Sequence, residues 1–236
     1  MPIPTWLAIA KGPVFRFALA ILILGLARLI LLSMWEMMTA VYRAGDRRVS
    51  YLRAIKETLS WFSPLQRVHR TRPFYTLAIL AFHLGVICSG LFLPSHIAFV
   101  ESVTGFTWPA MPRFLLNCFT LIAIFAGAFL ILYRLYSRRA RARSKIMDYL
   151  LPLFVLNLLI SGFIAGRPGN PIPYHQLMLF HTINGIILLV LIPYTKIAHC
   201  VLLPLLRLVS EIAWHLRPQG GTDVIKTLYG PEGRRL

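Results

Sequence analysis

Apolar residues gather in five long runs along the chain, separated by segments that are polar or carry proline. Each run reaches the length of about 20 residues that a helix needs to cross the hydrocarbon core of a bilayer. The pattern therefore predicts an all-α integral membrane protein, a bundle of five transmembrane helices over residues 1–205 with a cytoplasmic tail over residues 206–236. The predicted spans cover about residues 17–38, 74–95, 114–133, 146–165 and 177–204.

Composition excludes a soluble globular domain. Hydrophobic residues make up 57% of the 236 residues and charged residues only 14%, against roughly 25% charged in soluble domains. Three cysteines are scattered without a CxxC pair, so neither a disulfide framework nor a thiolate metal site is indicated. The first apolar run is too long for the core of a signal peptide, so we expect it to be a retained span.

Basic side chains predict the orientation of the bundle. Five spans place the two chain ends on opposite sides, and the loops richest in Lys and Arg stay in the cytoplasm. Twenty of these residues lie in the loops after spans one and three or towards the C-terminal end from Lys196 onward, whereas the other side holds Lys11, Arg16, Arg113 and Arg167. We therefore expect the N-terminus outside and the C-terminus in the cytoplasm of a bacterial cell, across its inner membrane. Lipid head groups or an acidic cytoplasmic partner explain the basic clusters; nucleic acid is not expected.

Histidines at membrane depth are the candidate ligands. His83 lies inside span two and His96 at its outer end, while His181 and His199 lie near the outer and inner ends of span five. The last two are 18 residues apart, which is about five turns of one helix, so both imidazoles are expected on one face. Ligands stacked in this way suit two haems, each with a second axial histidine from a facing helix.

Depth pairs these histidines as an inner and an outer set. His83 is expected to face His199, and His96 to face His181. The 13 residues between His83 and His96 do not bring them to one face of an ideal helix, unless Pro94 kinks or ends the helix. An alternative second ligand is His69, whose rotation fits better but which lies in a basic loop. Hydrogen bonding across helices is the alternative to a ligand role.

Arg28 is a second unusual residue, because it lies near the middle of span one. A buried guanidinium needs an anion, and haem propionates would supply two carboxylates for it. A snorkelling arginine is the alternative explanation.

The motifs around these histidines resemble a known family. Phe82-His83-Leu84-Gly85-Val86, the Pro94-Ser95-His96 turn, Phe180-His181 and the segment from Ile192 to His199 are similar to the membrane cytochrome b, or gamma subunit, of respiratory nitrate reductase. Leu93 stands where that type has its second histidine in span two. The spacing of His83 and His96 looks more like the cytochrome b subunits of the high-molecular-weight cytochrome and sulfite-reductase-linked membrane complexes.

The resemblance implies a di-haem cytochrome b that carries electrons across the membrane. It implies two haem b groups, exchange with menaquinone or another quinone, and a cytoplasmic iron-sulfur subunit as partner. A periplasmic multihaem cytochrome c and other membrane subunits are further candidate partners. Arg113 falls where the nitrate reductase type has a lysine close to the quinone, and Glu101 is a candidate proton acceptor.

Two other functions remain open at this stage. A proton-relaying transporter would need more polar residues along the spans than this sequence offers. A cofactor-free anchor subunit would need only the five-span topology and would not need paired histidines. Phosphate-binding loops, HExxH zinc motifs and GxSxG nucleophile motifs are absent from the sequence, so no other catalytic chemistry is indicated.

Overall fold

A computed structural model describes the chain except for residues 1, 45–50, 62–72, 168 and 216–236. Within this part every regular element is helical and no strand occurs. The chain forms two compact units, one made of residues 1–22 and 64–192, the other of residues 23–63 and 193–236. The boundary between them falls inside the long helix α2.

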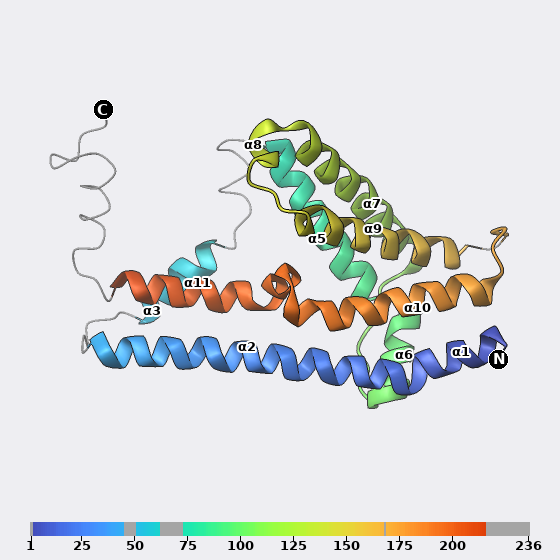
Figure 1. Ribbon diagram of the computed structural model, residues 1–236, viewed down its shortest axis with the longest axis horizontal. Coiled ribbons are helices and arrows are strands. Elements are labelled where there is room, and N and C mark those ends of the chain that lie inside the picture. The colour runs from blue at the N-terminus through green and yellow to red at the C-terminus, as the bar shows by residue number, and fades with distance from the viewer. Residues whose placement is uncertain (1, 45–50, 62–72, 168, 216–236) are drawn as a thin grey trace. The chain divides into compact units, whose positions relative to one another are not determined.

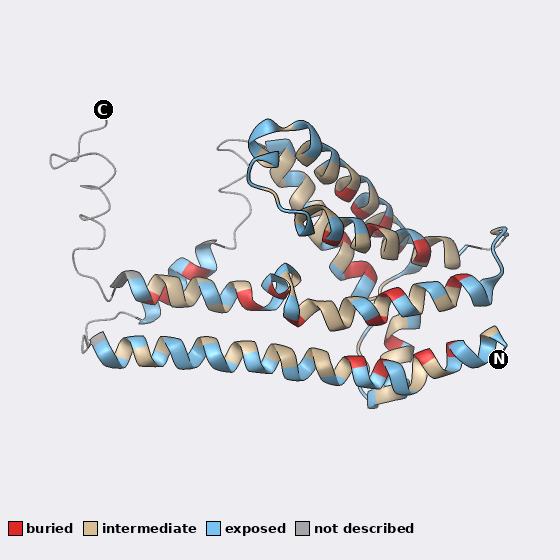
Figure 2. Ribbon diagram, in the orientation of Figure 1, coloured by how far each residue is buried: buried red, intermediate tan, exposed pale blue. Residues whose placement is uncertain are grey.

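Five helical segments in the described part are long and apolar enough to cross a membrane, which confirms the expected number of spans. In the first segment only 6% of the most apolar stretch is buried inside the protein, and in the other four 17%. Figure 2 shows the same exposed surface along α2. Apolar surface of this extent matches a lipid environment, as in a multi-pass membrane protein. The segments are Ile3–Arg43, Pro73–Leu91, Arg113–Tyr136, Met147–Ala165 and Tyr174–Tyr194.

The first unit contains most of the helices. Helix α5 packs against α7, α7 against α9, α9 against α10, and α10 against α1 (Figure 1). A π-helical turn around Pro13 joins α1 to α2. The elements are α1 (Ile3–Ile9), the π turn (Ala10–Val14), the start of α2 (Phe15–Ala44), α5 (Pro73–Leu91), α6 (Pro94–Thr104), α7 (Arg113–Tyr136), α8 (Arg138–Arg141), α9 (Met147–Ala165) and α10 (Tyr174–Leu191).

Glycines allow close packing between α5 and α7. A Cβ placed on Gly85 would lie 2.6 Å from the Cβ of Ala123, and one placed on Gly127 would lie 2.8 Å from the ring of Phe82. Small residues of this kind let the backbones of membrane helices approach each other. The close approach of α5 and α7 therefore depends on glycine, which has no Cβ, at these two positions.

The second unit contains the rest of α2 together with α3 (Tyr51–Trp61) and α11 (His199–His215). Helix α3 packs against α11, and buried Ala54 and Ile212 form the centre of their contact. Gly25 of α2 lies close to Pro193, whose Cβ would be 2.6 Å from a side chain placed on the glycine.

The structure corrects the predicted bounds of spans two and five. Helix α5 ends at Leu91, and α6 begins at Pro94 after an extended Leu93, so the break at Pro94 that the sequence left open does occur before His96. Span five was predicted as one helix over 177–204, and this is wrong. Helix α10 ends at Leu191, two 3-10 turns follow, and α11 begins at His199.

Proline is the physical reason for the second break. Pro193 lacks a backbone N–H and its ring crowds the preceding turn, while Thr195 is extended and its side chain caps the next turn at Ile197. The inference that His181 and His199 share one face of a continuous helix therefore fails. Helix α11 also crosses the boundary predicted between residues 205 and 206.

Candidate functional site: a pair of histidines

Two of the four predicted ligands come together in the first unit. His96 is the third residue of α6, and His181 lies in the second turn of α10. Their ring centroids are 6.1 Å apart, and the planes of the two rings differ by only 13°. This is the pair that depth along the predicted spans assigned to the outer side.

Each of these imidazoles has its Nδ1 atom engaged. His96 Nδ1 lies 2.9 Å from the backbone carbonyl of Gly90, and His181 Nδ1 lies 3.0 Å from Ser161 Oγ. Neither Nε2 makes a hydrogen bond to another described residue. The ring nitrogen that remains available for a metal ion is therefore Nε2 in both cases.

Desolvation favours the neutral form of His96. Helix α6 lies outside the candidate spans, and desolvation lowers the pKa of His96 below its usual value, partly offset by the Gly90 carbonyl. A neutral imidazole has the free lone pair that a metal ligand needs.

Hydrogen bonds close the break before α6, and an aromatic contact holds the middle of this helix. Trp108 Nε1 donates a hydrogen bond of 2.8 Å to the carbonyl of Leu91, and the backbone N–H of Met111 bonds the carbonyl of Phe92. Farther along α6, the ring of Phe99 lies 4.4 Å from that of Phe15. The break that presents His96 is thus closed by bonds from the segment that follows α6.

Polar side chains on two successive turns join α9 to α10. Asn157 Nδ2 donates to Asn184 Oδ1 at 3.3 Å, and one turn farther Ser161 Oγ meets His181. Asn184 also donates to the carbonyl of Phe180. These bonds fix the register of α10 along α9, and with it the depth of His181.

Two glycines determine the space beside His181. A Cβ on Gly162 would lie 2.8 Å from Cε1 of His181, so the ring occupies the room that this glycine leaves. Gly185 is one turn from His181 on the same face of α10, and a Cβ there would meet no atom within 4 Å. The sequence shows both glycines, but only the structure separates their roles.

The other predicted ligands are divided between the units. His83 of α5 lies in the first unit, with Nδ1 at 2.8 Å from the carbonyl of Ile79. His199 starts α11 in the second unit, with Nδ1 against the carbonyl of Lys196. Their pairing as inner ligands stays a prediction. His69 lies outside the described residues.

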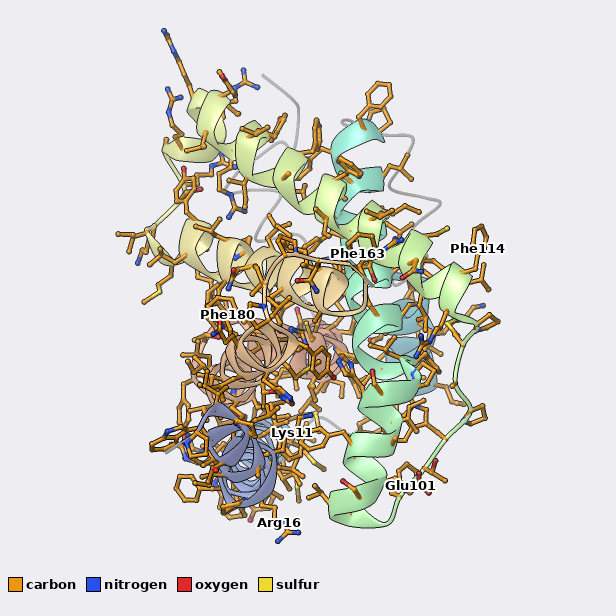
Figure 3. The ribbon with its side chains drawn as sticks, turned by 90° about the vertical axis from the view of Figure 1, so that its right-hand side faces the viewer. Lys11, Arg16, Glu101, Phe114, Phe163 and Phe180 are labelled. Carbon is orange, nitrogen blue, oxygen red and sulfur yellow. The ribbon has the colours of Figure 1, made fainter. Side chains whose placement is uncertain are left out.

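The charged residues predicted to take part in function, Arg28, Arg113 and Glu101, are exposed. Arg28 lies in the apolar stretch of α2, and Arg113 is the first residue of α7. Glu101 is exposed near the end of α6 (Figure 3). Their roles toward propionates, a quinone and a proton stay predictions.

A metal ion bound by protein side chains alone is not indicated in the described part, where no group of three or more His, Cys, Asp or Glu side chains gathers. Two side chains of this kind, His96 and His181, come together as a pair.

Sequence reasoning did not identify Asn157 and Ser161 as site residues, although Ser161 was visible as a small residue beside Gly162. The sequence does contain a pattern that indicates them. Asn157 and Ser161 are polar residues one turn apart on one predicted span, and His181 and Asn184 are similarly spaced polar residues on the next. In antiparallel neighbours such positions fall at equal distances from the connecting loop.

Known proteins offer little to compare with this chain. No family model and no solved structure matches the chain. A curated protein of Nitratidesulfovibrio vulgaris (strain Hildenborough), whose printed name is simply "Protein", is 29% identical over 150 residues. The match covers 63% of this chain and 66% of the relative, so the chain spans just under two thirds of that protein's length.

Proposed function

We propose that this protein is a b-type cytochrome that holds two haems and carries electrons across a membrane. The observation that supports it most is the pair His96 and His181, two near-parallel imidazoles with free Nε2 atoms in a largely apolar helical unit. The motif resemblance to membrane cytochrome b subunits is the second support.

The two rings lie close together. They are stacked within 13° of parallel, and their centroids are 6.1 Å apart. Open space above Gly185, on the face of α10 that carries His181, is compatible with a flat macrocycle beside the ring.

Bound haem would supply one-electron chemistry, and the protein supplies the axial ligands, their orientation and a dry environment. His96 and His181 would hold the outer haem, and His83 and His199 the inner one. Arg28 would bind propionates. Together the two sites would shorten each electron-transfer step across a hydrocarbon core of roughly 30 Å.

The proposed partners follow from the resemblance. Electrons would pass between menaquinone or another quinone, or a periplasmic multihaem cytochrome c, and a cytoplasmic iron-sulfur subunit. Arg113 and Glu101 are the candidate residues for the quinone and its proton. The proposed location is the bacterial inner membrane.

The decisive experiment is the absorption spectrum and haem content of the full chain purified from membranes. We expect a reduced b-type spectrum after dithionite and two haems per chain. His96→Ala and His181→Ala should each lower the content to one, because each removes an axial ligand of the outer haem. The matched control is His175→Ala, an exposed histidine on the same helix as His181, which should retain both haems.

Absence of a Soret band in the wild-type chain would overturn the proposal. The intact topology without haem would favour a membrane anchor, and proton flux in vesicles without haem would favour a transporter. Loss of haem in His175→Ala to the same extent as in His181→Ala would remove the ligand assignment.

A further inference from the structure

Ser161 is a buried hydroxyl in the apolar helix α9, one turn before the helix ends at Ala165. Its residue is only 3% exposed, and it lies on the side of α9 that packs against α10. Its oxygen has two partners: the carbonyl of Leu158 on its own helix, at 3.0 Å, and Nδ1 of His181, at 3.0 Å. A serine with both bonds connects the backbone of one helix to the imidazole of the next.

The proton count determines the direction of both bonds. A hydroxyl has one hydrogen, whereas a carbonyl oxygen only accepts. The Ser161 hydrogen is therefore donated to Leu158, and Ser161 Oγ accepts a hydrogen from His181 Nδ1. With its proton on Nδ1, the neutral His181 ring carries its lone pair on Nε2.

We propose that Ser161 is the positioning residue of His181, which holds the proton on Nδ1 and so selects Nε2 as the metal-binding atom. The part that concerns haem rests on the proposed function. The hold on the proton concerns the protein alone and exists before any cofactor binds. Partners of this kind orient metal-ligating histidines and set their basicity.

The two histidines of the pair differ in this respect. His96 donates to the backbone carbonyl of Gly90, six residues earlier, so its tautomer follows from its own segment. His181 donates to a side chain on another helix. A substitution at Ser161 therefore reaches one ligand and leaves the other unchanged.

Gly162 adds a steric constraint to the hydrogen bond. The ring of His181 lies against this glycine, where a Cβ would be 2.8 Å from Cε1 and 3.4 Å from Nε2. Ser161 and Gly162 together fix both the rotation of the ring and its proton. Without the hydroxyl, the ring would keep its position against Gly162 but lose the hydrogen-bond acceptor that selects one tautomer.

The test compares Ser161→Ala, Ser161→Thr and the control Thr120→Val. Thr120 is also buried, and its hydroxyl bonds only its own helix, at Leu116. In the full chain prepared without haem and labelled with ¹⁵N-histidine, the His181 signals, assigned by their loss in His181→Gln, report which nitrogen carries the proton. The same variants, loaded with haem, are compared for retention and midpoint potential of the outer haem.

We expect the wild-type chain, Ser161→Thr and Thr120→Val to hold the His181 proton on Nδ1. Ser161→Ala should show a mixture of tautomers and about 10-fold weaker outer haem retention, in the range typical for loss of such a partner, with a shifted potential. Restoration by threonine identifies the hydroxyl, because a purely structural role would not depend on it.

An unchanged tautomer in Ser161→Ala would overturn the proposal, as would an equal loss in Thr120→Val. If the wild-type chain binds no haem but the tautomer shifts in Ser161→Ala, the proposed function fails and the role of Ser161 in holding the proton stands. If haem binds in full to Ser161→Ala at an unchanged potential, the proposed function stands and the role of Ser161 in ligation fails.

Discussion

The four candidate histidines obtain their Nδ1 partners in two different ways. His83 and His199 use carbonyls three or four residues earlier, and His96 uses one six residues earlier. These bonds are local, because each joins a ring to a carbonyl only a few residues away along the chain. His181 is different because its partner belongs to another helix, which makes its orientation sensitive to helix packing.

Gly162→Ala tests that sensitivity at a single atom. The added methyl group would lie 2.8 Å from Cε1 of His181, so the ring must move away from α9. We expect a loss of about 1–3 kcal/mol of stability, the usual cost of overpacking, and loss of the outer haem with retention of the inner one. Thermal unfolding and haem content measure the two effects.

The control for this substitution is Gly166→Ala. At Gly166 a Cβ would meet only ordinary contacts at 3.6 Å and 3.7 Å, so both haems should remain. Full outer haem content in Gly162→Ala would mean that the ring of His181 does not need the room left by this glycine.

At the scale of elements, two of the candidate histidines, His96 and His199, each follow a helix break that contains proline. Pro94 occupies the first turn of α6, where its missing N–H costs nothing, and this places His96 at the start of a helix. Pro193 ends the apolar helix before His199. Both predicted spans continue through these points in hydropathy, which is why apolar length alone overestimated them.

Trp108→Phe tests how the first break is closed. The substitution removes the hydrogen bond to the Leu91 carbonyl and keeps an aromatic ring. We expect a loss of about 1 kcal/mol and weaker retention of the outer haem, since α6 loses one of its anchors. Thermal unfolding of the purified protein and haem content after repeated washing are the measurements.

Trp35→Phe is the matched control, because Trp35 is 69% exposed on an apolar helix and its substitution should leave both quantities unchanged. Equal effects of the two variants would show that the bond to Leu91 does not hold α6.

At the scale of the whole molecule, basic residues predict the orientation. The loop after span two is expected outside and the loop after span three in the cytoplasm. Phe106 and Ile146, one in each loop, are 67% and 72% exposed. They suit cysteine substitution in a chain whose Cys118 and Cys200 are replaced by serine.

A membrane-impermeant maleimide should label Phe106→Cys in whole cells with an opened outer membrane. Ile146→Cys should be labelled only after the inner membrane is opened, because that loop carries the basic cluster retained in the cytoplasm. Labelling of both variants in opened membranes is the control. The reverse pattern would invert the predicted topology.

Hydropathy and the positions of proline were enough to predict helices and the number of candidate membrane spans. Burial in lipid leaves few alternatives to a helix, so this information is local. Pro94 indicated a possible break in span two. The regular spacing of His181 and His199 predicted one continuous helix across Pro193, where the structure has a break.

Depth along the predicted spans paired His96 with His181, but only the tertiary structure decided how these side chains meet. The pairing of His96 with His181 at 6.1 Å, the bond from His181 to Ser161 and the close seat on Gly162 depend on how α6, α9 and α10 pack. Composition and periodicity do not encode such contacts, because the register between neighbouring helices arises from interdigitating side chains and a few polar bonds. Spacing along the chain predicted His96 and His181 as candidate ligands at one depth, whereas helix packing determined the contacts of the His181 ring with Ser161 and Gly162.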